Sequence, residues 1–290
     1  MVQSLLVYGL VNSVILILTA LGFSLTFGLS KVANFAHGGL YLFSGFVAWL
    51  ILHNLGLPYG VAIIAAILVT GVVGALIYQF ILLRVRGTEL SEVISTFAVG
   101  VAILELFRYL GFVTYEFNLP PFIKGQIQLV GVSIDYQRVF VIAVGLVLAV
   151  LLWLFTHHTK IGLALRGIAQ DEHTALTLGI ESDWAALFSV ALGSSLTAVA
   201  ALTILPLGII SINIGYEVLL IAVAVSVLGG LESTVGLIIG GLVLGYSQVI
   251  ASTIWGPQWM MVVYLAAIVL VLAVKPSGLL GKFKELEERV

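Results

Sequence analysis

The sequence predicts an all-α fold, a polytopic bundle of about eight or nine transmembrane helices. Of the 290 residues, 61% are hydrophobic and 9% are charged, and the mean hydropathy is +1.21. Soluble domains carry about a quarter charged residues, so lipid is the solvent that suits this chain. Long apolar runs in lipid must be helical, because their backbone groups have no water to bond. The alternating pattern of a membrane barrel is absent.

The apolar runs define the individual helices. A spanning helix needs about 20 mostly apolar residues. The first run is too long for the core of a signal peptide, so we interpret it as a retained helix. Two runs, 214–229 and 259–274, are short enough to be tilted, broken or partly re-entrant. The nine candidates are residues 5–29, 36–52, 60–83, 93–112, 138–156, 184–206, 214–229, 235–253 and 259–274.

The basic residues predict the orientation of the bundle. If the helices alternate, nine of the twelve Lys and Arg residues fall on one side. The positive-inside rule places that side in the cytoplasm, so the N-terminus is predicted outside and the C-terminus inside. Arg108, Lys124 and Arg138 fall on the outer side. The nine inner residues are Lys31, Arg84, Arg86, Lys160, Arg166, Lys275, Lys282, Lys284 and Arg289.

We predict a single transmembrane domain over residues 1–290, with two long connections. Residues 113–137 form an outer loop, and residues 157–183 form a cytoplasmic loop. Within the cytoplasmic loop, Gly162 to Ile180 is predicted to form one helix on the membrane surface, because its polar residues recur at helical spacing. This segment either ties two spans together at the interface or docks a cytoplasmic partner.

The chain lacks the motifs of an enzyme. There is no P-loop for ATP, no H-E-x-x-H zinc motif and no G-x-S-x-G nucleophile motif. Cysteine is absent, and the five histidines do not have the spacing of metal ligands. The sequence also has no block of basic residues of the kind that predicts a nucleic-acid partner. We therefore expect a non-catalytic chain without cofactor or metal, whose task is transport.

Polar residues at the start of the second helix form one candidate site. Asn34 and His37 lie where a charged gap gives way to residues 36–52. In the first interpretation, Asn34 caps the N-terminus of this helix and His37 is simply a residue near the helix end. Alternatively, a broken helix points its N-terminus into the transport path, where free N–H groups favour a carboxylate. Gly38 would permit a close approach.

A second group lies where the outer surface meets the seventh helix. It contains Ser211, Asn213 and Glu217. Glu217 either faces the ammonium group of a substrate or caps the helix through its first N–H groups. A further pair of polar residues, Glu105 and Arg108, lies near the outer end of the fourth helix. Their i, i+3 spacing allows them to form an ion pair at the outer rim.

Several motifs resemble one family of transporters. The most specific is N-F-A-H-G at residues 34–38. The segment G-L-A-L-R at 162–166, followed by Asp171, Ala175 and Gly179, is similar to a cytoplasmic coupling loop. Further matches are V-I-S-T-F-A-V-G at 93–100, V-L-G-G-L-E-S at 227–233 and P-S-G-L-L-G at 276–281. Together they resemble the LivH-type permeases of branched-chain amino acid ABC importers, although Gly167 stands where many relatives have alanine.

The resemblance implies a function and a set of partners. It implies a permease in the prokaryotic cytoplasmic membrane that pairs with a second permease, either a paralogue or a copy. Two cytoplasmic ATPase subunits would bind ATP and Mg²⁺, and an extracytoplasmic binding protein would deliver a branched-chain or other hydrophobic amino acid. The residues implied to dock on the ATPases are Gly162, Ala164, Arg166, Asp171, Ala175 and Gly179.

Three other functions remain open at this point. An ion-coupled secondary transporter would need acidic residues deep in the bilayer, and the acidic candidates here lie near helix ends. ABC permeases for urea or a sugar are related in sequence, so these two substrates are alternatives to an amino acid. A structural membrane protein that scaffolds a complex would need the partners but no transport.

Overall fold

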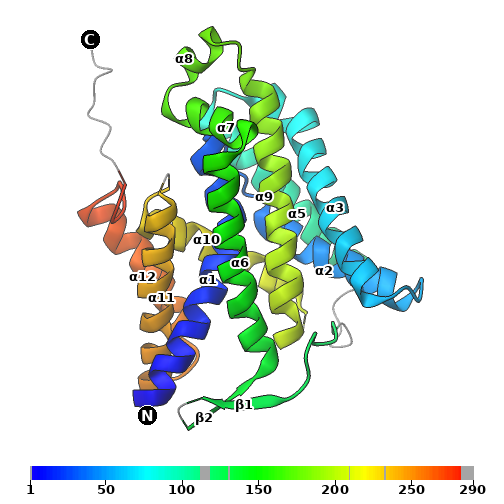
Figure 1. Cartoon of the computed structure of the whole chain (residues 1–290), viewed down its shortest axis with the longest axis vertical. Coiled ribbons are helices and arrows are strands. Elements are labelled where there is room, and N and C mark those ends of the chain that lie inside the picture. The colour runs from blue at the N-terminus through cyan, green and yellow to red at the C-terminus, as the bar shows by residue number, and fades with distance from the viewer. Residues whose placement is uncertain (1, 112–117, 130, 209, 232, 282–290) are drawn as a thin grey trace.

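A computed structural model describes residues 2–111, 118–129, 131–208, 210–231 and 233–281 as a helical bundle with one small β-hairpin (Figure 1). Several positions named above lie outside the described residues. They are residues 113–117 and 130 of the outer loop, position 232 of the glycine-rich motif, and the basic residues Lys282, Lys284 and Arg289.

All nine predicted helices are present in the described part of the chain. Seven are long and apolar enough to cross a membrane, while α2 and α12 are shorter. The first half contains α1 (Val2–Ser30), α2 (His37–His53), α3 (Tyr59–Ile77), the π-helical η1 (Tyr78–Leu82), α4 (Leu83–Val85), α5 (Glu89–Tyr109), β1 (Gln126–Leu129) and β2 (Val132–Asp135). The second half contains α6 (Tyr136–His158), α7 (Lys160–Gln170), α8 (Glu172–Thr177), α9 (Ser182–Ile204), the 3₁₀ turn η2 (Leu205–Leu207), α10 (Ile212–Gly229), α11 (Thr234–Trp255) and α12 (Trp259–Val274).

Proline and glycine set several of the boundaries. Helix α9 ends two residues before Pro206, as expected for a residue that lacks a backbone donor. Gly256, at φ +105°, turns the chain between α11 and α12. The rings of Trp255 and Trp259 lie 5.5 Å apart across this turn, so the two helices are joined by a tight hairpin.

The predicted inner and outer loops lie at opposite ends of the bundle. Helices α7 and α8 form one end, and the N-terminus and the β1–β2 hairpin form the other (Figure 1). Strand β1 pairs antiparallel with β2, with Ile127 opposite Ile134. Helices α1, α4 and α6 end toward α7 and α8, close to Lys31, Arg84 and Lys160. These basic residues thus lie toward the same end of the bundle, as the sequence predicts. The orientation of the bundle in the membrane stays a prediction.

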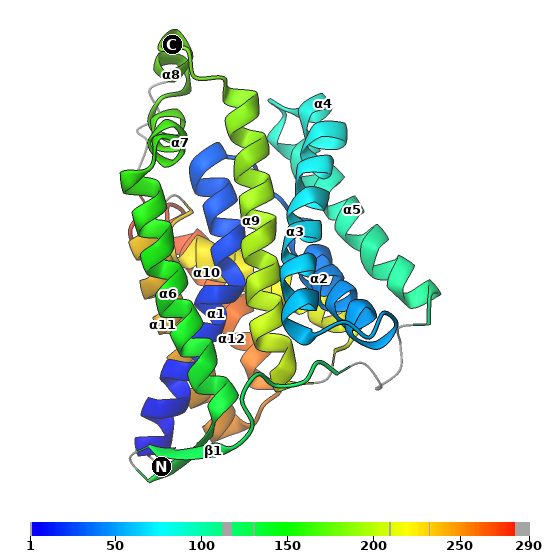
Figure 2. The ribbon, with the colours of Figure 1, turned by 45° about the vertical axis from the view of Figure 1, so that its right-hand side comes forward.

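The helices form two similar sets that run in opposite directions. Helix α1 packs against α9, α10 and α11, while α9 packs against α1, α2 and α3. Helix α2 in turn contacts α3 and α5, as α10 contacts α11 and α12. Each set therefore begins with a long central helix and continues through a shorter one, and both sets meet at the centre of the bundle (Figure 2). Internal repeats of this kind are common in membrane transporters.

The two central helices cross through a pair of glycines. A Cβ atom added to Gly193 would lie 2.8 Å from the carbonyl oxygen of Gly22, and one added to Gly22 would collide with the carbonyl oxygen of Gly193. The hydroxyls of Thr26 and Thr197 donate to those same carbonyls at 2.9 and 2.8 Å. Backbone therefore lies on backbone, and the polar groups at the crossing are satisfied, as lipid requires.

Helix α11 uses glycines on two faces. Gly236 and Gly240 pack against Gly229 of α10, and Gly241 and Gly245 pack against Ile17 and Ser13 of α1. The steps Gly236-xxx-Gly240 and Gly241-xxx-Gly245 are small-residue motifs that the sequence displays, and such motifs allow helices to pack closely. These four glycines thus hold α11 against α1 and α10.

Substitution at the central crossing should destabilise the bundle. In Gly193→Ala, the new methyl group has no space against Gly22 and Thr26, and overpacking of this kind costs about 1–3 kcal/mol. We expect the thermal unfolding midpoint in detergent to fall by roughly 2–8 °C. The matched control is Gly60→Ala, because nothing lies within 4 Å of the added Cβ. Equal midpoints for the two variants would contradict the proposed packing.

Candidate functional site

Helix α2 begins in the middle of the bundle rather than at its end (Figure 2). The chain leaves α1 at Ser30 and turns back between the helices before α2 starts. His37 there contacts Thr19, well inside α1, and a Cβ on Gly39 would lie 2.8 Å from the carbonyl oxygen of Gly100, midway along α5. The broken helix considered from the sequence is therefore present, and residues 31–36 form its non-helical link.

Side chains satisfy the backbone of this link. The amide of Phe35 donates to the hydroxyl oxygen of Thr96 at 3.0 Å, and the Asn34 carboxamide oxygen accepts from the amide of Ala36 at 3.2 Å. Asn34 is buried, and its carbonyl also accepts from the amide of His37. Asn34 thus shapes the turn before α2, while α2 itself has no side-chain cap. The role of Thr96 was not predicted from the sequence, where it is one threonine within an apolar run.

His37 connects three helices. Its Nε2 lies 2.8 Å from the carbonyl oxygen of Thr19 on α1, and its Nδ1 lies 3.0 Å from the hydroxyl of Thr197 on α9. A carbonyl can only accept, so Nε2 carries the proton and Nδ1 of the neutral ring can only accept. The one hydroxyl proton of Thr197 is then shared between Nδ1 and the carbonyl oxygen of Gly193. The ring is buried, and Phe23 packs against it edge-on. Both ring nitrogens are therefore used to hold α2 in place.

Helix α10 begins beside α2. A Cβ on Gly38 would collide with the carbonyl oxygen of Gly215, so the two helices touch through their backbones near both N-termini. Asn213 and Glu217 lie on either side of Gly215, at a spacing that places them on one helix face, and both are exposed. The structure thus brings the two predicted groups together at mid-depth, one buried and one exposed.

The capping role considered for Glu217 is wrong. Helix α10 starts at Ile212 and has no acidic residue in its first turn, so Glu217 lies beyond the free N–H groups. Ser211 is the N-cap residue, but its side chain makes no capping bond. Ser211 instead lines a small apolar pocket of about 20 Å³ together with Trp49, Phe107 and Ile212. Sequence analysis did not predict this pocket, since its walls come from three separate helices.

The expected ion pair between Glu105 and Arg108 is confirmed. Arg108 lies 3.4 Å from a carboxylate oxygen of Glu105, and the hydroxyl of Tyr216 donates to the same carboxyl group at 3.3 Å. Because Tyr216 is next to Glu217 on α10, this pair ties the end of α5 to the start of α10.

The single helix predicted for Gly162 to Ile180 is wrong. The structure has two helices, α7 and α8, that are separated at Asp171. Asp171 has an extended backbone (φ −154°), and its carboxylate accepts from the amide and the hydroxyl of Thr174 at 3.1 and 2.6 Å. Aspartate stabilises a helix at the N-cap position but is unfavourable inside a helix. This explains why one helix ends and a new one begins at Asp171.

Residues 162–180, which we name the coupling segment after their predicted role, contain two predicted glycines, Gly162 and Gly179, and both have a structural role. A Cβ on Gly162 would collide with the carbonyl of Phe155, so glycine permits the sharp turn from α6 into α7. Gly179 adopts φ +82° after α8. Its amide donates to Leu176, and the amide of Ile180 donates to Ala175, which is the Schellman pattern of a helix C-terminus.

The coupling segment packs against both central helices. Leu165 of α7 and Ala175 of α8 are buried in a cluster with Leu29 of α1 and Ala185 of α9. Ala164 and Arg166 are half-buried on α7. Three leucines of the segment face outward, with exposed fractions of 52%, 50% and 76% for Leu163, Leu176 and Leu178. In one continuous helix, Leu176 would lie on the same face as Leu165; the break at Asp171 leaves it exposed instead.

A polar contact links the start of α9 to η1 and to the residue that follows α4. Arg86 forms an ion pair with Asp183 in the first turn of α9. The hydroxyl of Tyr78, in the π-turn η1, lies 3.3 Å from the Arg86 guanidinium and 3.4 Å from the Asp183 carboxylate. Sequence analysis did not predict this contact, because its partners are 97 residues apart.

Comparison with known proteins agrees with this architecture. Residues 5–272 match the family described as "Branched-chain amino acid transport system / permease component". The chain is 30% identical to the high-affinity branched-chain amino acid transport system permease protein BraD of Pseudomonas aeruginosa, over 96% of this chain and 95% of that protein. It is also 30% identical to LivH of Escherichia coli, over 91% of each chain. A solved structure of PsaBC from Streptococcus pneumoniae shares the fold, with a TM-score of 0.53, 13% identity, and coverage of 94% of this chain and 92% of that one.

The cap at Asp171 should control the order of α8. Hydrogen bonds from Thr174 hold the pKa of the Asp171 carboxyl below its usual range. Because the unfolded pKa is about 3.9, the ionised cap stabilises α8 above that pH, and its contribution is lost as pH falls through the lower folded value. We expect hydrogen-exchange protection factors for α8 to stay constant from pH 7 to about 4 and to fall below it.

Substitution offers a second measure of the same cap. Asp171→Ala should lower the protection of α8 several-fold at pH 7, whereas Asp171→Asn should retain most of it, since asparagine also caps helices. If alanine and asparagine give the same protection, the cap does not order α8.

Proposed function

This chain belongs to the family of permease components of branched-chain amino acid transport systems, and we propose that it is the membrane-spanning subunit of an ATP-driven importer in a prokaryotic cytoplasmic membrane. The cargo we propose is a branched-chain or other hydrophobic amino acid, in keeping with the names of the relatives. ATP and Mg²⁺ would bind to separate ATPase subunits, and a binding protein would deliver the substrate at the opposite end.

The observation that carries this proposal is the exposed polar face of α10 at mid-depth. Glu217 and Asn213 are exposed beside the contact between Gly38 and Gly215, about halfway along the length of the bundle. A carboxylate facing lipid at this depth is costly, so such residues normally face a partner or a water-filled path. A second permease, whether a paralogue or a copy, would cover this face and enclose the path.

The surroundings of α10 suit a hydrophobic amino acid. Glu217 can pair with the ammonium group of the substrate. The N-termini of α2 and α10 converge here, and the first N–H groups of a helix favour a carboxylate. Phe107, Trp49 and Ile212 supply apolar surface nearby. Asn34 and His37 then support the path by fixing the start of α2.

We propose that α7 and α8 form the docking surface for the ATPases. The exposed leucines Leu163, Leu176 and Leu178 offer apolar contacts, and Arg166 and Asp171 offer charges. Because Leu165 and Ala175 are packed against α1 and α9, a push on this segment would reach both central helices. The binding protein would contact the other end, which carries the β-hairpin and the Glu105–Arg108 pair.

Docking can be tested by co-purification. Leu178→Glu places a charge on the most exposed leucine of the segment, so recovery of the ATPase subunits should fall about tenfold, as for one well-buried interface residue. Arg166→Glu should also reduce recovery. Leu55→Glu is the matched control, because Leu55 is 60% exposed between α2 and α3, away from α7 and α8. Full recovery with both test variants would exclude this surface as the docking site.

The transport role can be tested in proteoliposomes that contain both permeases, the ATPases and the binding protein. We expect uptake of leucine, isoleucine or valine that depends on ATP. Glu217→Gln should lower uptake at least tenfold, because it removes the charge that pairs with the ammonium group, while ATPase recovery stays unchanged. Gln79→Ala is the control, because Gln79 is an exposed polar residue of η1 that belongs neither to the proposed path nor to a proposed docking surface. Uptake by the chain alone without ATP would instead identify an ion-coupled transporter.

A further inference from the structure

A groove of about 310 Å³ opens between the start of α7 and the start of α9. Its walls are largely apolar and include Ile161, Leu165 and Ile180. Lys160 and Glu181 also line it, one from each side of the coupling segment. The groove is therefore an apolar trough that carries one positive and one negative charge.

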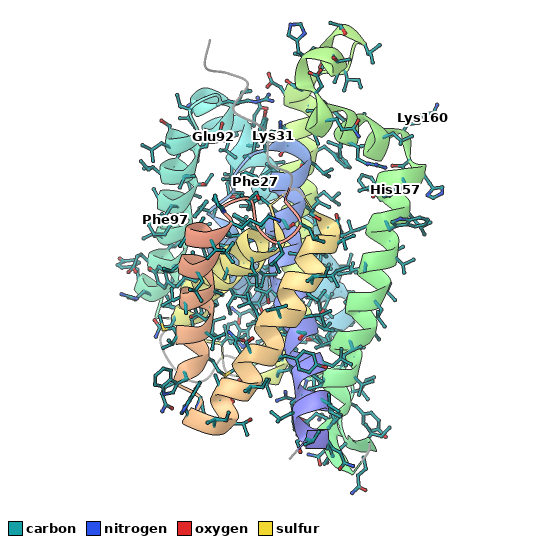
Figure 3. All side chains as sticks on the ribbon, turned by 90° about the vertical axis from the view of Figure 1, so that its left-hand side faces the viewer. Phe27, Lys31, Glu92, Phe97, His157 and Lys160 are labelled. Carbon is teal, nitrogen blue, oxygen red and sulfur yellow. The ribbon has the colours of Figure 1, made fainter. Side chains whose placement is uncertain are left out.

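Both charges of the groove are available to a ligand. Lys160 and Glu181 are exposed, and within the described part of the chain neither forms a salt bridge with the other or with a third residue. The side chains of His157 and Lys160 point away from the bundle at the junction of α6 and α7 (Figure 3). A ligand that fits must offer an anion and a cation at its polar end and an apolar body.

The groove lies at the level expected for lipid headgroups. Helix α6, which leads into it, is the most apolar and the least buried of the seven candidate spans. Trp153 and Trp184 are 54% and 56% exposed on either side, and tryptophan concentrates at the membrane interface. Below the groove, Phe188 stacks on Trp184 at 5.7 Å and on Phe155 at 6.2 Å, so an aromatic seam runs down between α6 and α9.

This side of the bundle faces away from the proposed second permease. In Figure 3, His157 and Lys160 lie on the opposite side from Glu92 and Phe97 of α5. Helix α5 is tied to the start of α10 through Glu105 and Tyr216, next to the proposed path. Lipid is thus the neighbour expected along α6.

We propose that this groove is a binding site for a phospholipid whose headgroup carries both a phosphate and a primary ammonium, the chemistry of phosphatidylethanolamine. Lys160 pairs with the phosphate, and Glu181 accepts from the ammonium. One acyl chain follows the aromatic seam of Phe155 and Phe188. The site lies directly against the coupling segment, so bound lipid would fill the space between α7 and α9.

The test uses the purified full chain, stripped of lipid in detergent and then supplied with phosphatidylethanolamine, phosphatidylglycerol or phosphatidylcholine of identical acyl chains. Native mass spectrometry reports how much of each lipid stays bound. We expect phosphatidylethanolamine to be retained best. Lys160→Ala and Glu181→Ala should each lower its retention about fivefold, the effect of one charge near a lipid surface. Glu181→Lys should shift the preference to phosphatidylglycerol.

Lys124→Ala is the control, because Lys124 is exposed near the β-hairpin, and it should leave retention unchanged. Equal retention of the three lipids, or no effect of the groove variants at unchanged thermal stability, would overturn the proposal. So would displacement of the lipid by added ATPase subunits, which would assign the groove to their interface. The measurement needs neither ATP nor substrate, so it is independent of whether the proposed transport function holds.

Discussion

The crossing of α1 and α9 at Gly22 and Gly193 determines where the other helices can lie. The carbonyl oxygen of each glycine occupies the space that a Cβ atom on the other residue would need. Threonine hydroxyls one turn away bond the carbonyls at the contact, so the crossing leaves no unsatisfied polar group on these carbonyls. Since α1 supports α10 and α11, and α9 supports α2 and α3, this contact holds the two helix sets together.

The same geometry explains why two helices begin inside the bundle. The central helices are long, and α2 and α10 turn back against them, so their first residues meet at Gly38 and Gly215. Irregular backbone at this depth must find partners inside the protein. Thr96 and Asn34 bond the link before α2, and His37 bonds to both α1 and α9. The polar groups of the N-F-A-H-G motif therefore serve first to hold an interrupted helix.

The coupling segment rests on the same central pair. Its buried residues Leu165 and Ala175 contact Leu29 of α1 and Ala185 of α9. Asp183, at the start of α9, is in turn paired with Arg86 beyond η1. Displacement of α7 and α8 would thus reach the helices that support α2 and α10. Packed side chains thus connect the proposed docking surface with the helices that line the proposed path.

The sequence alone determined the class of protein, the nine helices and the two long loops. Run length and composition sufficed for this, because lipid forces apolar segments into helices whatever their neighbours are. The close packing of α11 and the Glu105–Arg108 pair followed from spacing along one helix. The break at Asp171 was a local signal that helical periodicity obscured.

Only the tertiary structure decided the depth at which α2 and α10 begin, the partners of His37, and the exposure of Glu217. These depend on contacts between segments far apart in the chain, such as Gly38 with Gly215 and Arg86 with Asp183. An apolar run has nearly the same composition whether it spans the membrane or stops halfway. Its depth is set by the helices it packs against, and that information is not contained in the run itself.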